Sequence, residues 1–164
     1  MRIRAGMLAV LTLAPLSPSP LQAQGSPEGA WTVVEAWGEN PTDGEWRLDE
    51  ELQPSLFIFR DGFYSIAYVS GAEPRSLLPA GATRSTLTPE QAAAVWIPYV
   101  SNSGTFDVEG STIVTHPTVA LNPNTMAKGY VRSYALDWDG DDMLLRVDGD
   151  GFWYVLKLRR LGRR

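Results

Sequence analysis

The single histidine of this 164-residue chain, His116, is the first side chain to consider for chemistry. Imidazole titrates near neutral pH and acts as a general base when a nucleophile, an acid or a metal ion lies beside it. The chain has no Gly-x-Ser-x-Gly motif to supply a nucleophile and no second histidine for a zinc site. The run TIVTHPTVAL predicts a strand without clean alternation, so Thr115 and His116 compete for the interior. We therefore expect a polar histidine on the sheet, with a ligand contact or catalysis beside a tyrosine as alternatives.

Arg132 is the second candidate because it interrupts an aromatic and aliphatic strand face. In the run YVRSYALDW, alternation places it on one side with Tyr130, Tyr134, Leu136 and Trp138. An isolated charge in such surroundings is costly, so the guanidinium must pair with an acid, face water or bind a ligand. Two interpretations stay open. One is an internal ion pair with an Asp or Glu, and the other is a forked hydrogen bond to a carboxylate-bearing ligand.

Aromatic side chains that carry a polar atom are frequent in the predicted strands and in one predicted helix. Such side chains can line an apolar pocket that still offers hydroxyl or indole donors. Core packing explains most of them equally well. Beside Arg132 and His116, the ligand-binding candidates are Tyr64, Tyr68, Trp96, Tyr99, Tyr134 and Tyr154, with Trp153 as a further aromatic of the last strand.

The acidic run at residues 137–148 has several carboxylates at the spacing of a calcium-binding loop. The glycine that such a loop requires is replaced by Asp142, and strand-forming residues flank the run where helices would be needed. A hairpin turn is therefore the better interpretation. The chain contains no cysteine, which excludes disulfides and thiolate zinc sites. No metal ion and no cofactor is predicted.

Short runs of β-formers, separated by turn signals, make up almost everything after Ala30. The turns contain RDG, DGDD and DGDG, whose glycines accept the positive φ angles of tight hairpins. Strands joined by consecutive hairpins form an antiparallel meander. One helix interrupts the pattern, with Thr88 as its N-cap, Pro89 at its first position and Gln91 completing a capping box, before Pro98 ends it. The sequence predicts an all-β fold, an antiparallel up-and-down barrel of about eight strands with one short capping helix.

The first residues have a different character. Arg2 and Arg4 precede an apolar run at residues 5–16, which is followed by SPSPLQAQG. This pattern is typical of a secretory signal peptide, and the apolar run is short for a membrane span. We predict a signal peptide at residues 1–23, cleaved near Ala23, and a barrel domain at residues 24–164 in the bacterial periplasm or outside the cell. The net charge of −5 argues against a nucleic-acid partner.

Several motifs resemble those of a known family. The GAW at residues 29–31 is similar to the G-x-W signature of lipocalins. The bacterial lipocalin-like domain family, mostly of unknown function, shows a G-T-Y/F-x-V strand, a strand ending before N-P, and an R-x-Y/F-x-L strand before a D-x-L-x-L hairpin. The matching residues here are 104–108, 122–123, 132–136 and 143–145. The resemblance implies a small barrel in which Trp31 packs under a basic residue of the last strand, Arg159 or Arg160.

These observations lead to three expectations about function. The first is an exported lipocalin-like barrel that binds a small hydrophobic or amphipathic molecule, with Arg132 as the anchor for an anionic group. The second is an isomerase, cyclase or hydrolase in the barrel lumen that uses His116 with a tyrosine. The third is a packed barrel with a structural or interaction role. The oligomeric state does not follow from the sequence.

Overall fold

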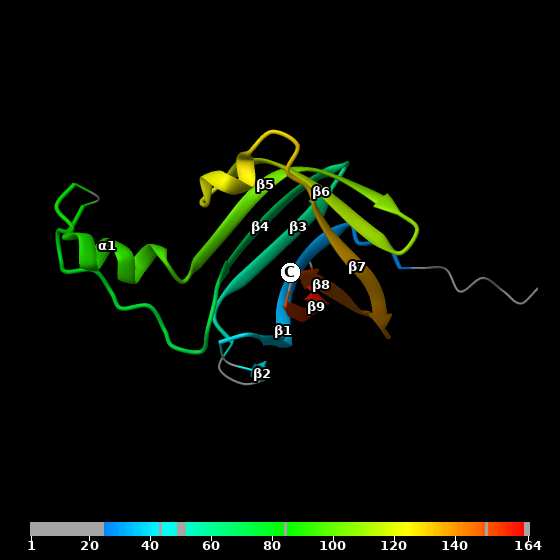
Figure 1. Ribbon diagram of the computed structural model, residues 1–164, viewed down its shortest axis with the longest axis horizontal. Coiled ribbons are helices and arrows are strands. Elements are labelled where there is room, and N and C mark those ends of the chain that lie inside the picture. Colours follow the sequence, from blue (N-terminus) through cyan, green and yellow to red (C-terminus); the bar gives the residue numbers. More distant parts are fainter. Residues whose placement is uncertain (1–24, 43, 49–51, 84, 150, 163–164) are drawn as a thin grey trace, which may run out of the picture.

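The computed structural model describes residues 25–42, 44–48, 52–83, 85–149 and 151–162. The predicted signal peptide at residues 1–23 lies outside the described residues. The described part is mostly β-structure, with one α-helix and one 3-10 helix (Figure 1). In chain order the elements are β1 (Gly29–Asn40), β2 (Gly44–Leu48), β3 (Ser55–Arg60), β4 (Phe63–Val69), α1 (Pro89–Trp96), β5 (Tyr99–Glu109), β6 (Thr112–Ala120), η1 (Pro123–Met126), β7 (Arg132–Asp139), β8 (Asp142–Gly149) and β9 (Phe152–Arg160).

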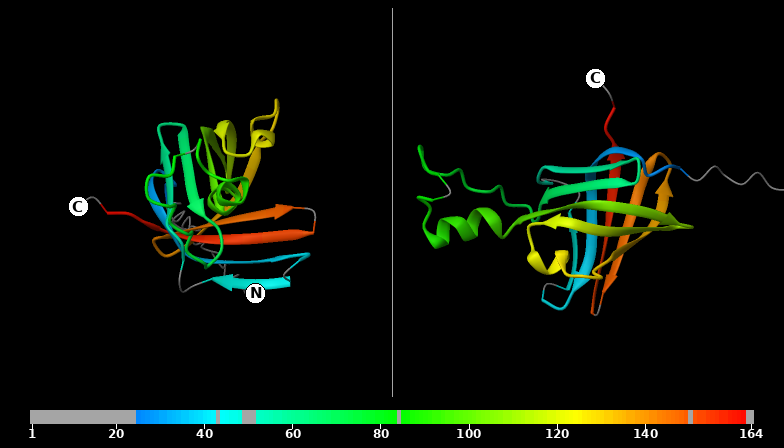
Figure 2. Two further views of the ribbon diagram at one scale, coloured as in Figure 1. Left: turned by 90° about the vertical axis from the view of Figure 1, so that its left-hand side faces the viewer. Right: turned by 90° about the horizontal axis from the view of Figure 1, so that it is seen from above.

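The strands form a closed antiparallel barrel, as the sequence predicts. Neighbouring strands follow the order β1-β3-β4-β5-β6-β7-β8-β9, and pairing between β1 and β9 closes the ring. Figure 2 shows the strands wrapped around a common interior. The ninth strand, β2, is an addition that the sequence did not predict. It pairs with the second half of β1, from Ala36 to Asn40, while the first residues of β1 pair with β3.

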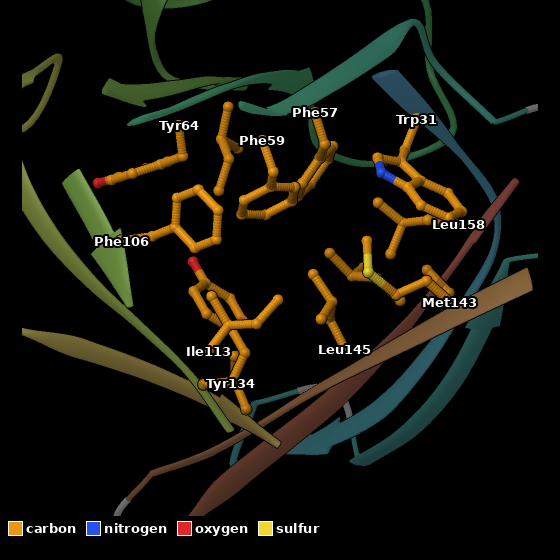
Figure 3. Close-up of a cluster of buried hydrophobic side chains, with 14 residues drawn as sticks. Trp31, Phe57, Phe59, Tyr64, Phe106, Ile113, Tyr134, Met143, Leu145 and Leu158 are labelled. Atoms are coloured by element: carbon orange, nitrogen blue, oxygen red, sulfur yellow. The ribbon is translucent and has the colours of Figure 1, made fainter. Parts of the chain in front are cut away.

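Alternation along the last three strands selects the interior side chains. Met143, Leu145 and Val147 of β8 are buried, and Leu158 of β9 is fully buried. Figure 3 shows labelled side chains of this interior, with Trp31 near Leu158 and Met143 and with Tyr64 near Phe106. The buried cluster consists of Trp31, Ala36, Phe57, Phe59, Tyr64, Ile66, Phe106, Ile113, Tyr134, Met143, Leu145, Val147, Leu156 and Leu158.

One end of the barrel is closed by the pair that the resemblance implies. The Arg160 guanidinium carbon lies 4.1 Å from the centre of the Trp31 ring, so the partner is Arg160 and not Arg159. Trp31 Nε1 donates to the Pro27 carbonyl at 2.7 Å, and Arg160 Nη2 donates to the Ser26 carbonyl at 2.9 Å. Gly29 adopts a φ of 141°, and a Cβ there would collide with the Arg160 guanidinium. This arrangement fixes the chain entering β1 against the last strand.

The opposite end is less completely sealed. The pairing of β6 with β7 stops at Thr115 and Arg132, although β6 continues to Ala120. The connection through η1 therefore bridges a gap between two strands. The helix α1 begins as predicted, with the Thr88 capping box in place, but it does not lie across the barrel end. None of its residues is buried, and it projects away from the strands (Figure 1).

The acidic run forms the β7–β8 hairpin, in agreement with the favoured interpretation. Gly140 occupies the turn with a φ of 62°. Asp142 accepts two hydrogen bonds from Arg159, at 3.1 and 2.8 Å, and Asp139 pairs with Lys157. Two of the carboxylates of the run are therefore used in cross-strand ion pairs on the outside of the barrel.

Candidate ligand-binding cavity

A cavity of about 610 Å³ opens at the barrel end near η1. Its size lies within the range of cavities that hold small molecules. The lining side chains come from β3, β4, β5, β6, β7 and β9, and from the segments around α1 and η1. They are Phe57, Ile66, Tyr68, Trp96, Ile97, Tyr99, Val100, Ser101, Asn102, Pro117, Leu121, Asn122, Thr125, Tyr130, Arg132, Tyr134, Tyr154 and Leu156. The lining is mainly aromatic and aliphatic, and Asn102, Tyr130 and Arg132 add polar groups at this end of the barrel.

Arg132 is the charged residue among those that line the cavity. Its Nε and Nη2 atoms donate to the hydroxyl oxygen of Tyr130 at 3.1 and 3.0 Å. Within the described ranges, no carboxylate lies at ion-pair distance from this guanidinium. The internal ion pair left open by the sequence is therefore not formed among these residues. Because Tyr130 accepts both hydrogen bonds, its own proton remains able to donate into the cavity.

Three further tyrosines surround the guanidinium. Burial raises the pKa values of Tyr68, Tyr134 and Tyr154, and the positive charge of Arg132 offsets part of each rise. Burial also acts to lower the pKa of Arg132, but the hydrogen bond to Tyr130 and the nearby phenols outweigh it, so that this pKa is raised. At neutral pH the site consequently combines one fixed cation with neutral hydroxyl donors. Such a group is suited to bind an oxyanion.

A polar network lies beside the inner end of the cavity. Tyr64, which is buried, donates to Asn102 Oδ1 at 2.7 Å. The buried Thr115 hydroxyl donates to the Arg132 carbonyl at 3.0 Å. Burial raises the pKa of Tyr64 to about 12. These bonds hold β4, β5, β6 and β7 together where the core ends, and they fix the backbone that carries Arg132.

His116 lies on the outer side of the barrel wall. Ile113 and Thr115 are buried and face inward, whereas the His116 side chain is 45 % exposed and does not line the cavity. Its Nε2 lies 3.5 Å from Asp107 Oδ2, across the β5–β6 pair. This placement agrees with a polar surface histidine. Both the enzyme hypothesis and the ligand-contact hypothesis require the imidazole in the lumen, and it does not lie there.

Most of the other predicted site residues do meet at the cavity. Tyr68, Trp96, Tyr99, Tyr134 and Tyr154 line it together with Arg132. Two aromatics of the predicted set are placed elsewhere. Tyr64 belongs to the buried core and reaches the site through Asn102. Trp153 lies under the Arg146 guanidinium and donates to Glu39 on the outside.

Sequence reasoning missed two polar residues of the site. Tyr130 shares the inward face with Arg132, two residues away, so alternation contained the signal for its role. Asn102 lies within β5, which begins at Tyr99 shortly after the helix. Its partner Tyr64 is 38 positions away in the sequence, and only the β4–β5 pairing brings the two together.

A larger depression, of about 1060 Å³, lies at the opposite end of the barrel. It is bordered by the tips of the β5–β6 and β7–β8 hairpins and by Gly25. Its charged residues include Asp142 and Arg159, which pair with each other, and Arg160, which covers Trp31. These contacts close the barrel, and none of the predicted ligand-binding residues lies there.

Comparisons with known proteins add little to this description. No protein-family model and no curated protein matches the chain. The chain is similar to a solved structure of an uncharacterised protein from Bacteroides eggerthii, at 13% identity and a TM-score of 0.38, over 79% of this chain and 97% of that one. In the described part, no helix is long and apolar enough to cross a membrane.

Proposed function

We propose that this protein is an exported, lipocalin-like binding protein whose barrel takes up a small amphipathic molecule with an anionic group. The ligand enters at the η1 end, its oxyanion is held by Arg132, and its apolar part lies against aromatic rings. The predicted signal peptide supports a location in the periplasm or outside the cell. The similarity of the Trp31–Arg160 pair to the lipocalin arrangement supports the family assignment within the same proposal.

The observation that carries the proposal is Arg132 in an open cavity without a carboxylate partner in the described part of the chain. The hydrogen-bond acceptor of this half-buried guanidinium, the Tyr130 hydroxyl, is neutral, so the positive charge is not balanced by an acid. A structural arginine would be expected to have an acidic partner, as Arg159 has in Asp142. An oxyanion from a ligand would supply that partner and complete the site.

The remainder of the lining fits an amphipathic molecule better than a fully polar one. Phe57, Ile66, Leu121 and Leu156 present apolar surface, and the tyrosines add rings that end in hydroxyl donors. A ligand oxyanion at Arg132 would also reach the free proton of Tyr130. The remaining volume would be filled by apolar groups, which supply the larger part of the binding free energy.

Titration calorimetry with decanoate and its neutral amide, decanamide, tests this function. Both probes carry the same apolar chain, but only the carboxylate can satisfy the Arg132 charge. We expect decanoate to bind more tightly than decanamide by roughly tenfold or more, because a charge-assisted hydrogen bond contributes about 1.5–3 kcal/mol. Equal affinities for decanoate and decanamide would refute the proposal that the ligand carries an anionic group held by Arg132. Absence of binding by decanoate, decanamide and aromatic acids alike would favour a barrel with a structural or partner-binding role.

A further inference from the structure

A second, smaller cavity of about 200 Å³ lies next to the first. It is formed where the additional strand β2 covers the second half of β1. Apolar side chains make up most of its lining, which consists of Val33, Ala36, Trp46, Leu48, Leu52, Gln53, Ser55, Tyr68, Val69, Ser70, Gly71, Tyr154 and Leu156. Among these residues there is no charged side chain.

The two cavities share one wall. Tyr68, Tyr154 and Leu156 border both of them. The Tyr68 ring stacks on Phe57 with centroids 6.0 Å apart, and the Tyr154 ring stacks on Phe152 at 6.5 Å. The wall is therefore made of two supported rings and one leucine. Its hydroxyl-bearing side faces the Arg132 site, and apolar surface lies beyond it.

An irregularity in β1 brings two of its residues to the second cavity. The register of β1 against β9 shifts between Val33 and Glu35, which marks a bulge. As a result Val33 and Ala36, three positions apart, both line the cavity. The small side chain of Ala36 leaves the space open opposite Trp46 and Leu48 of β2.

We propose that the second cavity is a tail site, which selects elongated ligands with an anionic group at one end and a compact apolar group at the other. This inference rests on the proposed function, since Arg132 must hold the anionic end. The apolar group passes between Tyr68 and Tyr154 and occupies the space under β2. A cavity of about 150 Å³ lined by apolar residues is large enough to hold benzene, so this one accommodates a phenyl ring or a short branched alkyl group.

A series of phenylalkanoates, from phenylacetate to phenyloctanoate, tests the inference by titration calorimetry. On the wild-type protein we expect affinity to rise as the linker lengthens, to peak when the ring reaches the tail site, and to decline beyond that length. The substitution Ala36→Phe fills the tail site and leaves Arg132 untouched. It should lower the affinity of the best long probe by roughly 10- to 150-fold, because this factor corresponds to the free energy of burying one apolar group of side-chain size. The affinity of phenylacetate should stay unchanged.

Val33→Phe, on the same strand and lining the same cavity, serves as a second filling variant should Ala36→Phe fail to fold. Ile58→Phe adds the same ring on a partly exposed position of β3 outside both cavities, and it is the matched control. If the filling variants leave long probes unaffected while Arg132→Leu weakens every probe, the tail site is refuted and the proposed function stands. If decanoate binds the wild-type protein and no phenylalkanoate does, the tail site is refuted and the proposed function stands. If neither decanoate nor any phenylalkanoate binds, both are refuted.

Discussion

Replacing Arg132 by leucine should separate stability from binding. Leucine keeps an apolar side chain on the inner face of β7 and removes the charge. If the guanidinium is present for a ligand, the free protein should tolerate its loss, and the affinity for a carboxylate should not. If the guanidinium is a structural element, the reverse should hold.

The expected magnitudes follow from the contacts of this residue. The substitution removes two hydrogen bonds to a single phenol oxygen, which contribute about 1 kcal/mol to folding. It also removes a half-buried charge without a carboxylate partner in the described residues, and replacing such a charge by an apolar group is often neutral or stabilising. We therefore expect the free energy of unfolding to change by no more than about 1 kcal/mol. The affinity for decanoate should fall by roughly 10- to 150-fold.

Two measurements on the same preparation check this prediction. Urea unfolding followed by tryptophan fluorescence gives the change in stability, and titration calorimetry with decanoate gives the change in affinity. Arg60→Leu is the control, because it alters the net charge equally at an exposed position of β3. A loss of more than about 3 kcal/mol of stability together with unchanged decanoate affinity would refute the reasoning and make Arg132 a structural residue.

Three further predictions concern other parts of the barrel. His116→Ala should change the free energy of unfolding by less than about 0.5 kcal/mol and leave the decanoate affinity measured by calorimetry unaltered, since the side chain is on the outer surface. A weakened decanoate affinity would show that His116 contributes to the binding site. Because the pKa of Tyr64 rises from 10.0 to about 12 on folding, the unfolded chain ionises first, and stability should decline as pH rises from 10 toward 12. Tyr64→Phe should reduce that decline, measured by urea unfolding at a series of alkaline pH values. If the free energy of unfolding falls with pH equally steeply in the variant and the wild type, the prediction is wrong. Gly29→Ala should cost at least about 1–3 kcal/mol, through backbone strain and collision with Arg160; wild-type stability in the same assay would show that the closed end tolerates a side chain.

The strands could be predicted because their signals are local. Alternation in the runs from β7 to β9 identified the inward residues, and the glycines of RDG and DGDG marked the hairpins. The strand β2 was missed because GEWRL is short and carries Glu45 and Arg47, so its composition indicates an exposed segment. Its pairing with Ala36 and the residues after it depends on β1 continuing beyond its pairing with β3 while it stays paired with β9, which no local pattern reveals.

The candidate site was predictable in its residue types but not in its partners. Alternation could place Arg132 among aromatics, but whether an acid faces it depends on the five other strands that line the cavity. The orientation of His116 was undecidable from TIVTHPTVAL, because both of its faces carry β-branched residues. The inward set became clear only from the pairing of Thr112 to Thr115 with β7. The open volume likewise depends on where the large core side chains stop, which is a property of the packed barrel.

Native mass spectrometry of the protein purified from bacterial cells tests the central claim most directly. The account predicts a protein population that retains a small molecule, which is released on denaturation, ionises as an anion and is lost in Arg132→Leu but kept in Arg60→Leu. A bare polypeptide mass, together with no binding of decanoate or phenylalkanoates when they are added back, would contradict the claim that this barrel holds an anionic amphipathic ligand.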